Sequence, residues 1–329
     1  MSETLHLKII YPFSMNIMAE EDLPSGLDDF LELSGKLSFQ TEYLKETFIS
    51  ISHLETCKPI SDPYKGERNA LVFEATVNIK DIQYNQEVIT SYGSPLSNEE
   101  LFEFYLTSIR GYFKRKVFYV LVLNQVASPG WICLGTGDVY FMDKLFGSAP
   151  SIKSILQEVY NEIKTIGWPK LQILPFMQVW DWFNKHGLDF EKHSTSKTGT
   201  ALNAFTHIFD DHSRDTVLEL LWAMVGIEAL YATSKDGIAE QIFTKSQILL
   251  GEMTDFKKKL KEMYNFRSRF FHGDLNIPPA MYEFYDAENE DYSKKLSSAA
   301  FLAIAILTAT LQKMIILDKP SLKFKTELE

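Results

Sequence analysis

Residues 254–273 read TDFKKKLKEMYNFRSRFFHG, and this stretch decides how the C-terminal part of the chain folds. Thr254 and Asp255 have side chains that commonly cap helix N-termini. Apolar residues then recur at helical spacing, and Gly273 is the residue type that most often follows a helix C-terminus. The stretch therefore predicts a helix that begins near Thr254 and ends at His272.

Three further helices are predicted around this one. Their apolar residues follow the helical period, and their expected bounds are 215–232, 237–250 and 292–317. Pro278 and Pro279 prevent the helix that ends at His272 from continuing into the loop 274–291. Four helices joined mostly by short loops indicate a small helical bundle over residues 210–329.

The first 200 residues have a different character, because short segments typical of β-strands stand between helical ones. Strands are expected at 5–11, 36–40 and 71–79. Helices are expected at 98–114, with an extension to residue 122 left open, and at 151–166 and 179–186. The polar segment 191–200, EKHSTSKTGT, is interpreted as a linker or exposed loop. The sequence thus predicts an α+β protein with a mixed domain at 1–200 and a helical domain at 210–329.

Composition restricts the class of protein. With 329 residues, 45% of them hydrophobic, the chain is long enough for two folded domains. The formal net charge of -11 argues against a general nucleic-acid-coating protein and leaves room for a local basic site. Cys57 and Cys133 are far apart, which argues against a disulfide framework or a zinc finger. The longest apolar run, 299–311, is shorter than a membrane span, so we expect a core helix in a cytoplasmic protein without metal or cofactor.

Arg267 and His272, near the end of the predicted helix, are the candidate catalytic pair. A guanidinium neutralises phosphate oxygens and an imidazole transfers protons, so together they can handle a phosphodiester without a metal. His272 lies where the helix dipole stabilises positive charge. There it can donate a proton to a leaving 5′-oxygen or accept one from a 2′-hydroxyl. The alternative is that His272 only caps the helix.

A helical wheel places Arg267 in the middle of the apolar face and separates it from His272 by about 140°. The same apolar face also contains Tyr264 and Phe271. A buried guanidinium needs a partner, because an unpaired charge is costly to bury. Glu228 is the best candidate, since it also stands among apolar residues, in VGIEAL at 225–230. An internal ion pair that only fixes the helix register is the alternative to a catalytic role. On the catalytic interpretation, the two residues form one site only if the bundle dimerises around this helix end.

The same helix is locally basic, in contrast to the acidic protein that carries it. A single acid, Glu262, stands among six cations, which are Lys257, Lys258, Lys259, Lys261, Arg267 and Arg269. Such a stripe is typical of a surface that binds a polyanion, and a solvated lysine face is the alternative. Arg269, three residues before His272, is an auxiliary phosphate contact.

These residues resemble the HEPN domains, particularly their ApeA-like branch. The resemblance rests on GIEAL at 226–230, on MYNFRSRFFHG at 263–273 and on the order of the helices. HEPN ribonucleases have four to six residues between an Arg and a His, and Arg267 and His272 have four between them. Many catalytic members have Asn, Asp or His directly after the Arg, where this chain has Ser268.

The resemblance implies an all-helical domain that dimerises, with the two Arg/His pairs lining one cleft. It implies metal-independent RNA cleavage by attack of the 2′-hydroxyl, with Arg267 binding the scissile phosphate and His272 acting as acid and base. The basic stripe adds Arg269 and Lys261 as expected RNA contacts, and Ser268 would bond a phosphate or orient His272. Family members often serve in antiphage defence or as toxins.

Three hypotheses follow from the residues and the resemblance together. The first is a cytoplasmic endoribonuclease, active as a homodimer, whose domain at 1–200 senses a trigger, restrains the nuclease or selects RNA. In the second, the helical domain is a non-catalytic dimerisation or RNA-binding module, in which Arg267 pairs internally with Glu228. The third is one half of a toxin–antitoxin pair, controlled by a regulatory protein or a phage-derived trigger.

Overall fold

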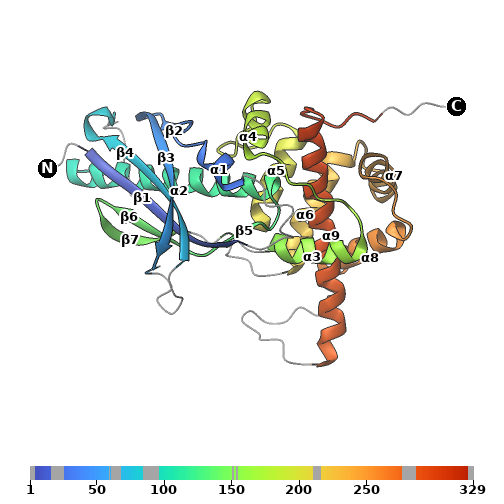
Figure 1. Ribbon diagram of the computed structural model, residues 1–329. Coiled ribbons are helices and arrows are strands. Elements are labelled where there is room, and N and C mark those ends of the chain that lie inside the picture. The colour runs from blue at the N-terminus through green and yellow to red at the C-terminus, as the bar shows by residue number, and fades with distance from the viewer. Residues whose placement is uncertain are drawn as a thin grey trace. The chain divides into compact units, whose positions relative to one another are not determined.

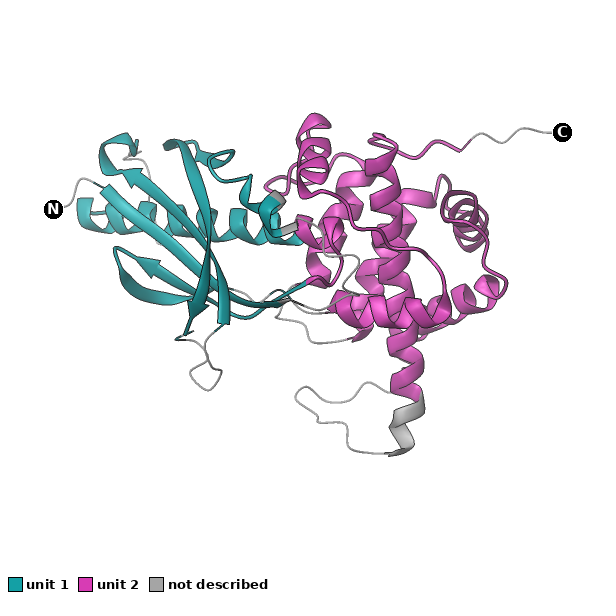
Figure 2. Ribbon diagram, in the orientation of Figure 1, with its two compact units in different colours: residues 1–122, 132–152 teal, residues 123–131, 153–329 magenta. Residues whose placement is uncertain are grey.

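The computed structural model describes residues 4–15, 26–58, 60, 68–83, 96–149, 152, 155–209, 216–275 and 287–324. The chain divides into two compact units, 1–122 with 132–152 and 123–131 with 153–329 (Figure 2). The first contains an antiparallel sheet and the second is helical, so the protein is α+β as predicted. The expected boundary between residues 200 and 210 differs from this division, because the helices between residues 155 and 208 group with the C-terminal ones.

The sheet of the first unit has the strand order β2-β3-β4-β1-β6-β7, with β5 paired to β1 outside this path (Figure 1). The strands are β1 Thr4–Met15, β2 Leu37–Thr41, β3 Leu44–Cys57, β4 Arg68–Asn78, β5 Ile132–Leu134, β6 Gly137–Phe141 and β7 Lys144–Ala149. β1 is central, since it pairs with β4 along one side and with β5 and β6 along the other. The predicted strands correspond to β1, β2 and β4, whereas β3, β5 and the β6–β7 hairpin were not predicted.

One face of the sheet packs against α2, Asn98–Ala127, whose residues up to Val122 belong to the first unit. The helix begins with a capping box, in which the Ser97 N–H donates to Glu100 Oε2 at 2.8 Å and the Glu100 N–H donates to Ser97 Oγ at 3.3 Å. The ring centroids of Phe39 on β2 and Phe113 on α2 are 6.1 Å apart. The short helix α1, Gly26–Leu31, adds Phe30 to the same core. The valine-rich residues 117–122 extend α2, because packing overrides their β propensity.

The second unit is formed by seven helices among its described residues, together with the last turn of α2. They are α3 Ile155–Ile166, α4 Phe176–Lys185, α5 Lys197–Ile208, α6 Thr216–Tyr231, α7 Ile238–Leu250, α8 Phe256–His272 and α9 Ala287–Ile316. The last four match the predicted C-terminal helices, and α3 and α4 match two of the N-terminal ones. The interpretation of 191–200 as a loop is wrong from Lys197 onward. There the Gly199 N–H donates to Ser196 Oγ at 3.0 Å and starts α5, which packs on α6.

α9 is the central helix of this unit and packs against α3, α4, α6, α7 and α8. Every residue from Leu302 to Gln312 is buried, which is the pattern of a helix enclosed on all sides. Gly226 lets α6 approach, since a Cβ at this position would lie 2.7 Å from Leu307 Cδ2. Tyr292–Ile316 is long and apolar enough to cross a membrane, and 83% of its most apolar window is buried in the protein. The prediction of a core helix at 299–311 is therefore confirmed.

Gln312 fixes an irregular segment of the same unit to α9. Its side chain is 1% exposed and makes three hydrogen bonds to main-chain groups. The Gln172 N–H donates to Gln312 Oε1 at 2.9 Å, while Gln312 Nε2 donates to the carbonyls of Gln172 at 2.6 Å and Val126 at 2.8 Å. This one amide satisfies both main-chain groups of Gln172, in an irregular segment, and a carbonyl in the last turn of α2, where helix carbonyls lack an intrahelical partner.

Candidate functional site

The C-terminal end of α8 is closed by a glycine. Gly273 has a φ of 72°, a left-handed conformation that side chains with a Cβ rarely adopt. Its N–H donates to the Phe270 carbonyl at 3.2 Å, and the Asp274 N–H donates to the Arg269 carbonyl at 2.9 Å. This is the Schellman arrangement, so His272 is the last helical residue, as the sequence predicts.

Arg267 is held by two residues on its inner side. Its Nη2 lies 3.3 Å from Glu228 Oε2 on α6, and the Tyr264 hydroxyl donates to Glu228 Oε1 at 3.0 Å. The guanidinium carbon is also 5.8 Å from the ring centroid of Tyr264. Burial, and then the negative charge of Glu228, raise the pKa of Tyr264. The predicted partnership of Arg267 with Glu228 is therefore present, and it fixes the guanidinium at the α6–α8 contact.

Tyr264 was expected on the apolar face of α8, and its hydrogen bond to Glu228 was not predicted. It stands three residues before Arg267, so the two side chains share one side of the helix. A tyrosine at this spacing from an arginine was the available signal, because its hydroxyl needs a partner when its ring is packed. With Tyr264, both oxygens of Glu228 are bonded.

Arg267 lies at the flank of the buried face of α8 and not in its middle. The fully packed residues are Phe256, Leu260, Met263 and Phe266, whereas the Arg267 side chain is 35% exposed. Phe271, expected on the apolar face, is 67% exposed. The buried face is rotated toward Phe266 because its ring packs against the core helix α9, where Tyr292 lies at a centroid distance of 5.7 Å.

The other predicted site residues lie on the exposed side of α8. His272, Ser268 and Lys261 are exposed and make no hydrogen bond or ion pair with any residue that the structure describes. Arg269, predicted as an auxiliary phosphate contact, donates through Nη2 to the Asp274 carbonyl at 3.1 Å. Within the described chain, therefore, no contact joins His272 to Arg267. The separation of about 140° expected from the wheel persists, because α8 is helical throughout.

The basic stripe of α8 is partly neutralised by its neighbours. Lys257 pairs with Glu240 of α7 at 3.8 Å and lies 5.5 Å from the ring centroid of Phe243. Arg267 and Arg269 are engaged as described above. The exposed cations without a described partner on this helix are then Lys258 and Lys261, which leave a smaller positive surface than the sequence suggested.

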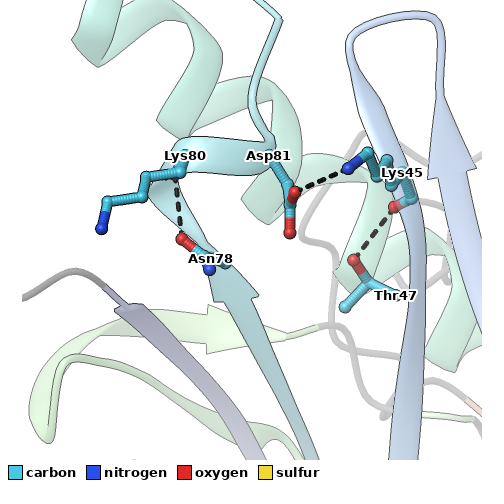
Figure 3. A network of polar contacts seen from close by, with 5 residues as sticks. All are labelled: Lys45, Thr47, Asn78, Lys80 and Asp81. Carbon is cyan, nitrogen blue, oxygen red and sulfur yellow. Dashed lines mark hydrogen bonds and ion pairs between the residues drawn. The ribbon is translucent and has the colours of Figure 1, made fainter.

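A second candidate site lies on the face of the sheet opposite α2. It is a hollow of about 670 Å³ whose lining includes Phe48, His6 and several charged side chains. Lys8 pairs with Glu74 at 2.9 Å, and Lys45 pairs with Asp81 at 2.9 Å (Figure 3). The charges within each of these two pairs neutralise each other, but Glu46 and Asp143 in the same lining form no ion pair with a described residue, so the hollow is net negative. Across the described residues, no group of three or more His, Cys, Asp or Glu side chains is placed to hold a metal ion.

Figure 3 also shows the local hydrogen bonds at this end of the sheet, where β4 ends and β3 begins. Asn78, at the end of β4, accepts a hydrogen bond from the Lys80 N–H at 3.0 Å and so caps the 3₁₀ turn η2, Ile79–Asp81. On β3, the Thr47 hydroxyl donates to the Lys45 carbonyl at 3.2 Å. These contacts are local, and they explain the geometry of the strand ends without a ligand.

No protein-family model, curated protein or solved structure matches the chain. Assignment of a function therefore rests on the residues themselves. Those at the end of α8 combine an arginine fixed by a carboxylate, an exposed aromatic ring and an exposed histidine within one and a half turns of helix.

Replacing Glu228 with alanine is expected to lower the free energy of unfolding of the second unit by about 1–2 kcal/mol. The change leaves the Arg267 charge and the Tyr264 hydroxyl without their acceptor, and the partial exposure of Arg267 limits the cost. Glu228→Gln keeps an acceptor for Tyr264 and should cost less. Denaturant unfolding measures both changes, with Glu240→Ala as the matched control, because its ion pair with Lys257 is exposed and should contribute about 0.5 kcal/mol or less. Equal effects at positions 228 and 240 would contradict the structural role of the network.

Proposed function

We propose that the protein is a metal-independent endoribonuclease of the HEPN type, which acts as a homodimer in the cytoplasm. The observation that carries the proposal is the placement of His272. It is the exposed last residue of α8, five residues after an arginine that Glu228 and Tyr264 hold in place. In this proposal Arg267 binds the scissile phosphate, and His272 removes the proton of the 2′-hydroxyl and protonates the leaving 5′-oxygen.

A second copy of the chain is needed in this proposal, because Arg267 and His272 point to different sides of α8. A twofold arrangement of two such helices would place the His272 of one copy beside the Arg267 of the other. α6 supports a contact of this kind, since several of its apolar side chains are not fully buried. Leu218, Leu221, Trp222 and Ala229 are half-buried, and Val225 is exposed. In the dimer, Ser268 and Lys261 are the expected RNA contacts beside this pair.

A second candidate function is a non-catalytic dimerisation or RNA-binding module. The ion pair between Arg267 and Glu228 favours it, because a guanidinium already bonded to a carboxylate must exchange that partner to bind phosphate. In both cases we propose a role as a toxin or antiphage effector that a regulatory protein or a phage-derived trigger controls.

The test of the nuclease proposal is incubation of the purified full-length chain with RNA in the presence of EDTA. We expect cleavage that continues without divalent metal and leaves 2′,3′-cyclic phosphate ends, because the 2′-hydroxyl is the nucleophile. A DNA strand of the same sequence lacks this hydroxyl and should stay intact. Products with 3′-hydroxyl ends, or cleavage abolished by EDTA, would exclude this mechanism, while a monomeric mass in solution would exclude the composite site.

A further inference from the structure

Aromatic rings and cations lie together where the β6–β7 hairpin faces α2. We call these residues the hairpin patch, and they are Arg110 and Lys114 of α2, Phe141 of β6, and Lys144 and Phe146 of β7. The Arg110 guanidinium carbon lies 3.9 Å from the ring centroid of Phe141 and 4.2 Å from that of Phe146. Lys114 Nζ donates to the Ser148 carbonyl of β7 at 2.8 Å, which ties the strand to the helix.

A β-bulge directs Phe146 into this patch. Val139 pairs with Gly147 and Tyr140 pairs with Leu145, so Phe146 is the extra residue that no residue of β6 opposes. Bulges of this kind re-aim a side chain. Here the ring packs against Arg110 on one side and is still 57% exposed. A Cβ built on the following residue, Gly147, would meet nothing within 4 Å, its chain neighbours apart, so the strand is open to solvent at this position.

The cations of the hairpin patch have no acidic partners in the described parts of the chain. Arg110 is only 9% exposed, yet its Nε has no hydrogen-bond partner in the part of the chain that the structure describes. Neither Arg110, Lys114 nor Lys144 forms an ion pair with a described carboxylate. A buried guanidinium without an anion is costly, and contact with aromatic rings offsets only part of that cost. Within the described residues, these cations therefore have no negatively charged partner.

The acids nearest in sequence do not fill this role. Asp138 of β6 accepts a hydrogen bond from the Ile60 N–H at 2.8 Å, and Asp143 occupies the turn of the hairpin. Glu103 lies about two turns before Arg110 on α2. Its charge acts on Arg110, but the two residues form no ion pair. None of these three acids therefore forms an ion pair with a cation of the hairpin patch.

We propose that the hairpin patch binds single-stranded nucleic acid, with a base stacked on Phe146 and phosphates neutralised by Arg110, Lys114 and Lys144. Exposed aromatic rings among unpaired cations are the combination that binds single strands without sequence preference. A second copy of the chain fits this surface poorly, because pairing β7 with itself would bring six like charges together. An acidic protein segment would satisfy the cations but would leave the flat, open face of Phe146 without a stacking partner.

The binding test uses the full-length protein and a fluorescein-labelled 2′-O-methyl oligouridine of about 12 nucleotides, which spans a typical single-strand site. The methyl group blocks 2′-hydroxyl attack, so binding is measured without cleavage. Fluorescence anisotropy should show that Phe146→Ala weakens binding about tenfold or more, and that Phe146→Trp restores it. Phe48→Ala is the matched control, since Phe48 is 54% exposed in the same unit and lies outside the patch.

Lys144→Gln supplies a second variant on an exposed side chain, with Lys36→Gln as its control. It should weaken binding and lower the slope of log affinity against log salt by about 0.7, the value for one phosphate contact to a single strand. Unchanged affinity in both Phe146→Ala and Lys144→Gln would overturn the proposal, as would an absence of binding by the unaltered protein. Binding of a polyglutamate peptide that depends on Phe146, without oligonucleotide binding, would assign the patch to an acidic protein instead.

The inference is independent of the proposed nuclease. Repeating the titration with Arg267→Ala separates the patch from the end of α8, and the dependence on Phe146 should be retained. A protein that binds RNA through the patch and never cleaves it would contradict only the nuclease proposal. If the protein cleaves RNA and the Phe146→Ala variant binds the oligonucleotide as tightly as the unaltered protein, only the proposal for the hairpin patch is contradicted.

Discussion

Replacing His272 with alanine is expected to lower the rate of RNA cleavage by about 10²- to 10⁴-fold, the usual contribution of a positioned acid or base. The imidazole is exposed and has no partner among the described residues, so its loss should leave the melting temperature unchanged. Activity is measured under single-turnover conditions in EDTA, and folding is followed by circular dichroism. His193→Ala is the matched control, because it removes another exposed histidine of the second unit.

Two outcomes would separate the hypotheses about His272. Full activity in His272→Ala would contradict its role as acid and base and would leave it a residue that ends the helix. Loss of activity in His272→Ala and in Arg267→Ala, followed by recovery when the two variants are mixed, would support a site made from two copies. Recovery is expected because a mixed dimer retains one intact pair.

Replacing Gln312 with leucine is expected to lower the free energy of unfolding by about 3 kcal/mol or more, since buried polar groups left without a partner cost roughly 1–3 kcal/mol each. Leucine fills much of the same volume but bonds neither the Gln172 main chain nor the Val126 carbonyl. Denaturant unfolding followed by tryptophan fluorescence measures the change. Gln178→Leu, on the exposed side of α4, should stay within about 0.5 kcal/mol of the unaltered protein.

A Gln312→Leu variant as stable as Gln178→Leu would mean that the segment near Gln172 gains nothing from the buried amide. Gln312→Glu gives a further comparison. It keeps the size of the side chain and an acceptor for the Gln172 N–H, but it removes the donor for the two carbonyls and adds a buried charge. It should therefore be at least as destabilising as leucine.

Apart from α5, the helices of the second unit were predictable from sequence because their signals are local. Apolar periodicity and the glycine after α8 place its end at His272 without any tertiary information. The β6–β7 hairpin has no such signal, since Met142 and Asp143 adopt φ values of 48° and 60° without the glycine or asparagine that usually marks this turn. Residues 117–122 show the reverse case, in which β-rich sequence is helical because the fold buries it in α2.

The sequence predicted which residues of the candidate site pair with each other, but it did not predict how deeply their side chains are buried. Glu228 could be matched to Arg267 because each was a lone charge among apolar residues. A wheel cannot tell which neighbour covers which side of a helix, and so it placed Arg267 too deep and Phe271 in the core. The hairpin patch had no sequence signal, since Arg110 and Phe146 meet only through a bulge and a packed helix.

The enclosure of α9 by five other helices has a consequence during protein synthesis. All of those helices precede α9 in the chain, so the ribosome produces them before the element that covers their apolar sides. Until α9 emerges, α6 and α8 lack the support that orients Glu228 and Arg267. A nascent chain therefore cannot assemble the proposed site, and any RNA cleavage would begin only after the last helix has left the exit tunnel.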